Sequence, residues 1–409
     1  MDIQILSILA LIVAIAIGFF RNVNTGLLGI SFAFFIGIFF AGMSANDIMK
    51  GFPLQLYLRL VGVSLLFFMA KTNGTMDLIA AFIERVSRGK NRLIPIFFFF
   101  ANSILTALGP GPLPANSIMI PMGMAVARRE KISDLLMGTM VASGALFGTL
   151  FPLSSTGIVA ITLSEGVGVT RYFPIFCGLT IAAFIEGIIL YAVLGGWKLK
   201  NHEVESRGEK IEITKEQKIT VLVIALFVIG VLVMKYELYL MAFLASTVLA
   251  ALGLVKQNEA IKSVPWGTFL MIAGVNMLIT VIEFVGGIAM IADTLSSVMT
   301  PVTASPIMAV IGGLMSTVSS AVGVVMPTMI PTTAGIASEV GGVTTSALIS
   351  AVITGSHLSA YSPMSGMGGL IMANANEETD KGKLFTQLII VALASTVLAA
   401  VWGFLGLYR

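Results

Sequence analysis

The sequence predicts an all-α polytopic membrane protein built from two inverted-topology repeats. Three observations predict this fold class. The 409 residues are 57% hydrophobic and only 11% charged, whereas about 25% of the residues in a soluble domain are charged. Apolar segments of the roughly 20 residues needed to cross a bilayer recur along the whole chain. The two halves of the sequence also match each other at a nearly constant offset.

The predicted elements follow one another along the chain as spans, hairpins and broken helices. Uninterrupted spans are expected at 3–20, 25–42, 54–71, 172–196, 218–235, 238–254, 266–284 and 384–407. The regions 93–127 and 305–338 are expected to be hairpins, because they carry helix-breaking proline and glycine at their centres. The long apolar regions 133–165 and 344–372 are expected to be broken helices. Each repeat then has five spans, with one re-entrant helical hairpin and one broken helix.

Matching residues define the repeat. Pro53 aligns with Pro265 at an offset of 212, and Gly74 aligns with Gly286 at the same offset. The segments 143–157 and 354–368 share the spacing P-x-S-x-x-G at an offset of 211. Apolar sequences rich in glycine and serine match by chance over short stretches. A nearly constant offset over more than 100 residues therefore favours a true repeat.

Basic residues predict the orientation. Arg88 and Lys90 precede the first hairpin, and Arg128 and Arg129 follow it, which places both of its ends in the cytoplasm. The second hairpin has no Lys or Arg on either flank and is expected to enter from the outside. Ten full crossings result, with both termini outside and the charged linker inside. Such inverted repeats are typical of secondary transporters.

Four breaks place non-helical backbone at membrane depth, which is tolerated only where protein or a wet cavity satisfies its polar groups. The breaks are the hairpin tips 109–116 and 319–328 and the broken spans at 149–157 and 360–368. Half-helix N-termini can hold an anion without Arg or Lys, and exposed carbonyls can coordinate sodium. The nearby hydroxyl and amide groups do not titrate, so a neutral, hydrogen-bonding site is expected.

The candidate site residues lie at these breaks. The substrate-binding candidates supply N–H groups, hydroxyls or an amide, and they are Gly111, Asn116, Ser117, Ser154, Ser155, Thr156, Val324, Thr328, Ser362, Ser365 and Gly366. The ion-binding candidates supply carbonyls or hydroxyls, and they are Thr106, Gly109, Gly157, Ser319, Ser320, Gly323 and Gly368. We expect sodium as the coupling ion, with no transition metal and no other cofactor. An isolated serine in a membrane helix usually bonds its own backbone, but four clusters at symmetric breaks favour a functional role.

Glu186, Glu283 and His357 are ionisable residues inside apolar segments. Glu186 and Glu283 are candidate proton carriers, because a buried carboxylate in a membrane is a functional candidate. Neither lies at a break, and a contact at the membrane interface or between subunits is the alternative. His357 adjoins the second broken span and could gate or sense pH, with a packed neutral histidine as the alternative. The stretch 75–90 and its counterpart 287–299 are expected to be interfacial helices.

The sequence argues against an enzyme. It contains no G-x-x-x-x-G-K-[ST] nucleotide motif, and no nucleic-acid partner is expected. The residues TGSH at 354–357 could suggest an intramembrane serine hydrolase. The equivalent position in the first half is SGAL, however, so a symmetric helix break explains the motif better.

Three stretches resemble a known family. They are GFPLQLYLRLVGVSLLFFMAKTNGTMDLIA at 51–80, LTALGPGPLPANSIMIPMGMAVA at 105–127 and FPLSSTGIVA at 151–160. They resemble the bacterial malonate and C4-dicarboxylate carrier family over roughly residues 1–160, and the second half follows through the repeat. More distantly, the architecture resembles the divalent anion/sodium symporters of the ion transporter superfamily. Where those symporters carry Ser-Asn-Thr signatures at the hairpin tips, this sequence has GPGPLP and SAVGVV.

The resemblance implies a homodimer in the bacterial inner membrane, in which transport domains move like elevators against scaffolds. Repeat one would cover 1–200, with scaffold spans at 1–90, hairpin and transport elements at 91–165 and a span at 172–196. A linker would cover 201–217. Repeat two would cover 218–409, with scaffold spans at 218–299, hairpin and transport elements at 300–372 and a span at 384–407.

The sequence thus predicts a secondary active transporter that imports a small dicarboxylate together with sodium. Two alternatives stay open. One is a proton-coupled or exchange carrier for another organic anion, such as a monocarboxylate, citrate or a sulfonate. The other is an ion antiporter or channel, although antiporters usually carry acidic residues in their helix breaks, and the four breaks have none.

Overall fold

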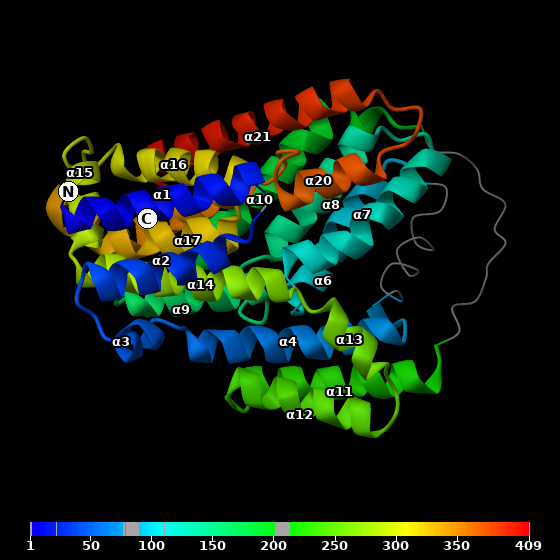
Figure 1. The fold of residues 1–409 in the computed structure, drawn as a ribbon. Coiled ribbons are helices and arrows are strands. Elements are labelled where there is room, and N and C mark those ends of the chain that lie inside the picture. The colour runs from blue at the N-terminus through cyan, green and yellow to red at the C-terminus, as the bar shows by residue number, and fades with distance from the viewer. Residues whose placement is uncertain are drawn as a thin grey trace.

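The computed structural model describes residues 2–21, 23–76, 78, 90–109, 111–200 and 213–408 (Figure 1). Throughout these ranges the elements are helices, and no strand is present. Six of the described helical segments are long and apolar enough to cross a membrane: Ile3–Arg21, Leu54–Thr72, Phe173–Val193, Trp266–Phe284, Ala321–Val340 and Lys381–Phe404. The prediction of an all-α membrane protein is confirmed at this level.

The first half of the chain forms the elements that end before the charged linker. In order they are α1 (Ile3–Arg21), α2 (Thr25–Phe39), α3 (Ala45–Lys50), α4 (Leu54–Thr72), α6 (Ile94–Ala107), α7 (Pro112–Arg129), α8 (Asp134–Gly148), α9 (Ser155–Gly166), α10 (Phe173–Val193) and the 3-10 turn η1 (Gly196–Lys198). Most of the expected interfacial helix at 75–90 lies outside the described residues.

The described elements of the second half follow a similar order, and the second leg of its hairpin is divided into four short elements. Its elements are α11 (Lys215–Leu232), α12 (Leu238–Ala251), α13 (Gln257–Ser263), α14 (Trp266–Phe284), α15 (Gly287–Ser296), α16 (Ala304–Val318), the π-turn η2 (Ala321–Val325), α17 (Met326–Met329), the 3-10 turn η3 (Ile330–Thr332), α18 (Thr333–Val340), α19 (Thr345–Leu358), α20 (Gly366–Asn374) and α21 (Lys381–Phe404). The expected counterpart helix at 287–299 is present as α15.

Side-chain caps explain where some of the helices start. Asn24 begins α2 by accepting a 2.8 Å hydrogen bond from the backbone N–H of Gly26. Thr214 and Gln217 form a reciprocal capping box, so α11 begins at Lys215. This start is three residues earlier than the span predicted from the apolar pattern, because the cap lies in the charged segment rather than in the apolar one.

Proline and serine make the breaks shorter than predicted. Pro112 stands in the first turn of α7, where its missing N–H needs no partner, so 112–116 are helical rather than part of the tip. In the second hairpin the chain becomes helical again at Ala321, after Ser320 caps η2. The non-helical parts of the broken spans are 149–154 and 359–365.

Helices of the two halves pack on one another in the outer part of the fold, where α2 contacts α14 and α4 contacts α12. The contact between α2 and α14 is made through glycine backbones. A Cβ built on Gly274 would lie 2.0 Å from the carbonyl oxygen of Gly26, and one built on Gly29 would lie 2.6 Å from the carbonyl oxygen of Gly274. Small residues allow such close approach between membrane helices.

Equivalent helix pairs inside each half also approach closely. A Cβ on Gly144 of α8 would lie 2.1 Å from the carbonyl oxygen of Phe99 on α6. A Cβ on Gly355 of α19 would lie 2.0 Å from the carbonyl oxygen of Ala309 on α16. The glycines are 211 residues apart and their contacts 210. The same crossing therefore occurs in both halves.

The chain termini lie at the same end of the molecule, at the left of Figure 1, and α11 begins at the opposite end. The described core residues form two clusters. The smaller one joins α1, α2, α3 and α14 and includes Val324 of the second hairpin. The larger one contains the rest of the core. The second hairpin tip thus packs directly on α14.

Candidate functional site

The first hairpin tip meets the first broken span. The backbone N–H of Ser155 donates a 3.1 Å hydrogen bond to the carbonyl oxygen of Gly109. Gly111 has φ +82° and ψ 178°, a conformation that is essentially restricted to glycine. A Cβ built on Gly111 would lie only 2.0 Å from Oγ of Ser155. These contacts hold the tip against the N-terminus of α9.

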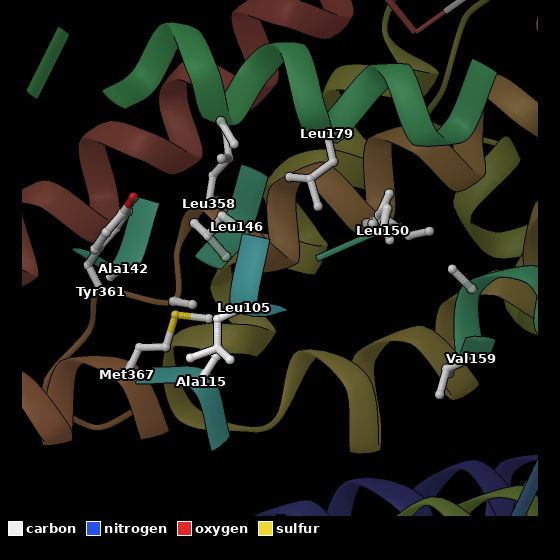
Figure 2. Packing of buried hydrophobic residues seen from close by; sticks show 14 of the residues in the cluster. Leu105, Ala115, Ala142, Leu146, Leu150, Val159, Leu179, Leu358, Tyr361 and Met367 are labelled. Atoms are coloured by element: carbon white, nitrogen blue, oxygen red, sulfur yellow. The ribbon is translucent and has the colours of Figure 1, made fainter. Parts of the chain in front are cut away.

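The second broken span contacts both hairpins. Oγ of Ser362 donates a 3.1 Å hydrogen bond to the carbonyl oxygen of Thr317, at the end of α16. A Cβ on Gly366 would lie 2.6 Å from the Leu113 side chain of α7. Figure 2 shows Met367 of α20 in one buried cluster with Leu105 and Ala115 of the first hairpin. The breaks therefore converge on one region.

A cavity of about 700 Å³ opens at this convergence. Seven of the predicted residues line it: Ser155, Thr156, Ser319, Ser320, Val324, Ser365 and Gly366. The other side of the cavity belongs to α1, the start of α2 and α14, including Asn24, Thr25 and Thr268. Sequence reasoning missed these last residues, because no break or motif marks them.

The cavity lining is mostly apolar, with hydroxyl and amide groups set into it and almost no charge. Among the described residues that line it, none is Asp, Glu, Lys or Arg, and His357 is the single ionisable side chain. The neutral, hydrogen-bonding character expected from the sequence is present in this lining. An anion here would be held by hydroxyls, amides and backbone N–H groups rather than by a fixed positive side chain.

Three predicted residues bury polar atoms that have no partner in the protein. The atoms are Oγ of Ser154, which is the N-cap residue of α9, Oγ1 of Thr106 and Nδ2 of Asn116. All three side chains are fully buried. Buried polar groups without a partner are rare, because each costs about 1–3 kcal/mol, and they mark places that a ligand, ion or water completes. Asn116 is held by Asn102, whose Nδ2 donates a 2.7 Å hydrogen bond to Oδ1 of Asn116.

Four predicted hydroxyls instead donate to their own helix or loop. Ser117 donates to Leu113, Ser319 to Met315, Thr328 to Val324, and Ser365 to Ala360 and Ser362. Ser117 is also exposed on α7 and does not line the cavity. These residues follow the alternative expectation for membrane serines and threonines. Ser319 and Ser365 still line the cavity, but their hydroxyl groups already donate hydrogen bonds to backbone carbonyls.

The predicted glycines shape the breaks. A Cβ on Gly157 would lie 2.2 Å from the carbonyl oxygen of Phe151, and a Cβ on Gly368 would lie 2.2 Å from that of Ser362. Both glycines allow the new half-helix to fold back on the break that precedes it. Gly323 donates its N–H to Oγ of Ser320 at 3.0 Å and packs against Met271 of α14.

The two intramembrane glutamates have different surroundings. Glu283 is exposed on α14, in keeping with an interface position. Glu186 is 2% exposed, so the alternative of a membrane-interface or subunit contact does not hold for it in this chain. Its Oε2 accepts a 2.8 Å hydrogen bond from the hydroxyl of Tyr361, which lies 2.7 Å from Oγ of Ser143. This network links α8 and α10 to the second broken span and was not predicted.

Comparisons with known proteins agree with this architecture. Residues 1–149 match the model of the family described as dicarboxylate carrier protein MatC N-terminus. A search of the curated proteins finds no match. Among solved structures, the fold is similar to that of the Alcanivorax borkumensis YdaH transporter, which is reported to have an unusual topology. The TM-score is 0.60 at 15% sequence identity, and the match covers 88% of this chain and 87% of that one. The resemblance to dicarboxylate carriers is confirmed over residues 1–149, and the fold of the chain resembles that of a solved membrane transporter.

Proposed function

We propose that the protein is a secondary active transporter that imports a small dicarboxylate, such as malonate or a C4 acid, together with sodium. The cavity at the convergence of the four breaks carries this proposal. Its lining carries hydroxyl and amide groups and almost no charge, and residues near the breaks also bury unpartnered polar groups at Ser154, Thr106 and Asn116, which do not themselves line the cavity. The N-terminal family match supports a dicarboxylate as the substrate.

In this proposal the two halves are inverted repeats. The matched crossings at Gly144 and Gly355 and the matched folds at Gly157 and Gly368 support this arrangement. The hairpins and broken spans would form a transport domain. It would move as an elevator past the scaffold formed by α1–α4 and α11–α14, because the cavity lies between these two groups. Alternating access then needs no change inside the site.

The carboxylates would be bound by N–H groups at the start of α9 and α20, by Ser154 and Ser155, and by the amide of Asn116. Free N–H groups and partial positive charge at a helix start suit an anion. Sodium would be bound by hydroxyl oxygens, with Thr106 the first candidate, since its Oγ1 is buried and without a partner. We further propose a homodimer in the bacterial inner membrane with both termini outside.

Sodium dependence gives the direct test of this function. Vesicles that contain the purified protein should take up radiolabelled malonate and succinate, and replacing sodium by choline should reduce the initial rate by about tenfold or more. Uptake of both acids that is equally fast in choline would contradict sodium coupling. Uptake that proceeds without any ion gradient or counter-substrate would indicate a channel. Uptake of a monocarboxylate, citrate or a sulfonate instead would point to the other anion carriers.

Removing the unpartnered hydroxyl of Ser154 should weaken substrate binding. A hydrogen bond to a charged group contributes about 1.5–3 kcal/mol, so Ser154→Ala should raise the dissociation constant about 10- to 100-fold. Ser365→Ala should also weaken binding, since Ser365 holds the second break through three hydrogen bonds. Ser31→Ala is the matched control, because Ser31 is exposed on α2 and donates only to its own helix. If both test variants bind as tightly as this control, the site assignment is wrong.

A further inference from the structure

His357 lines the cavity and has one ring nitrogen without a hydrogen-bond partner. The residue lies in the last turn of α19, is 1% exposed and lines the cavity. Its Nδ1 lies 2.8 Å from the carbonyl oxygen of Ile353. A carbonyl only accepts hydrogen bonds, so Nδ1 must carry the proton and donate. In the neutral ring, Nε2 is therefore a bare acceptor, and it is buried with no partner in the protein.

Because the described cavity lining has no Asp, Glu, Lys or Arg, the protonation state of this nitrogen affects which form of a substrate can bind. A dicarboxylate with both groups ionised brings two negative charges, the described lining offers no Lys or Arg, and one bound sodium would balance only one of the two charges. Transfer of unbalanced charge into a buried site is costly. A bare acceptor such as Nε2 would also repel a carboxylate oxygen, which has no proton to donate. Neutral His357 thus disfavours the dianion and fits a carboxyl group that carries a proton.

We propose that the cavity binds its dicarboxylate with one added proton, which is shared between Nε2 of His357 and a carboxyl oxygen of the substrate. The O–H of the singly protonated acid donates to Nε2, or the proton has moved to Nε2 and the imidazolium donates to the carboxylate. Both forms contain the same atoms and the same net charge. The inference rests on the proposed function and adds the protonation state in which the substrate is carried.

The proton and the anion depend on each other in this arrangement. Without substrate, an imidazolium at His357 would be a buried charge with no partner, which is costly. With substrate, the carboxylate supplies that partner. Each ligand therefore raises the affinity for the other by the same factor, as linkage requires. One proton would cross the membrane with each substrate molecule, in addition to any sodium.

Among the described residues on elements that pack against α19, no other ionisable side chain lines the cavity. The helices and turns that pack on α19 are α10, α16, α17, α18, α21, η2 and η3. Of these, α16, α17, η2 and η3 contain no ionisable side chain. The ionisable residues on the others, with Tyr408 just beyond α21, are Cys177, Glu186, Tyr191, Glu339, Lys381, Lys383 and Tyr408. None of these lines the cavity, and Glu186 is bonded to Tyr361.

Calorimetry can count the proton directly. Malonate and succinate are titrated at neutral pH into the purified full-length protein, in two buffers with different protonation enthalpies. We expect the wild type to take up close to one proton for each dianion bound. Its affinity should rise up to about tenfold for each unit by which the pH is lowered. His357→Gln places a permanent amide donor near the position of Nε2 and should bind without proton uptake. His202→Gln, at the other histidine of the chain, is the matched control and should behave like the wild type.

Each outcome separates this inference from the proposed function. If neither acid binds at any pH, the proposed function fails and this inference fails with it. If the acids bind but the wild type takes up no proton, only the inference is overturned, and this count needs no variant. Proton uptake that persists in a folded His357→Gln protein would also overturn it. Should His357→Gln not yield folded protein, His357→Asn retains a donor for Ile353 and serves instead, with the same expected loss of proton uptake.

Discussion

Gly355→Ala is expected to destabilise the protein strongly, because the added methyl group would meet the backbone of a neighbouring helix. The new Cβ would lie 2.0 Å from the carbonyl oxygen of Ala309, 2.7 Å from its carbonyl carbon and 2.8 Å from its Cα. All three are backbone atoms, so no side chain can rotate away, and α16 and α19 must separate by more than 1 Å to reach the ordinary contact range of 3.4–4 Å. Overpacking typically costs about 1–3 kcal/mol and occasionally more, so we expect about 3 kcal/mol here.

Thermal unfolding of the detergent-purified protein measures this effect. A loss of about 3 kcal/mol should lower Tm by roughly 5 °C or more, or prevent isolation of a monodisperse protein, because total stability is only about 5–15 kcal/mol. Gly166→Ala is the matched control, since Gly166 is helical, exposed and has nothing within 4 Å of the added Cβ. Equal Tm values for the two variants would show that α16 and α19 do not approach this closely.

The same measurement tests the proposed repeat. Gly144→Ala places a Cβ 2.1 Å from the carbonyl oxygen of Phe99, which is the equivalent crossing of α6 and α8. Under the repeat hypothesis the two substitutions should lower Tm by similar amounts. A large effect of one and none of the other would argue that the two crossings differ in kind.

Gly111→Ala is expected to abolish transport while leaving the protein folded. The φ of +82° with ψ of 178° strains any residue with a Cβ, at a cost of about 1–3 kcal/mol. The methyl group would also meet Oγ of Ser155 at 2.0 Å. Together these terms should disfavour the contact between the first tip and α9 by about 3 kcal/mol, so that its equilibrium constant falls about 100-fold. Because Gly109 and Ser155 make the only described backbone hydrogen bond between these segments, the cavity should lose one wall.

Uptake into vesicles and a paired substitution test this contact. Gly42→Ala is the matched control, since Gly42 also has a positive φ, +66°, but nothing lies within 4 Å of the added Cβ. It should transport normally. Adding Ser155→Gly to Gly111→Ala removes the atoms in conflict and should restore part of the uptake, as coupled neighbours do in a double-mutant cycle. Normal uptake by Gly111→Ala, or no gain from the second substitution, would show that the tip does not work through Ser155.

The structure distinguishes predicted site residues whose polar groups have no partner from those whose polar groups are already hydrogen-bonded. Ser154 and Ser365 occupy equivalent positions in the two broken spans. Nevertheless, the Ser154 hydroxyl is buried without a partner, whereas that of Ser365 donates to Ala360 and Ser362. The sequence shows the same residue type at the same spacing in both places. The difference arises from rotamers and from neighbours that only the folded chain brings within hydrogen-bonding distance.

The sequence by itself determined that this is an all-α membrane protein, where its helices are interrupted and which family its first 149 residues resemble. These properties depend on composition, on local helix breakers and on apolar length, and all of them act within a few turns of chain. Only the tertiary structure decided that the first hairpin contacts both broken spans, that the Tyr361 hydroxyl donates a hydrogen bond to Glu186 and that Nε2 of His357 has no partner. Those contacts join segments far apart in sequence, and their distances follow from helix packing, where glycine positions fix how closely the backbones approach.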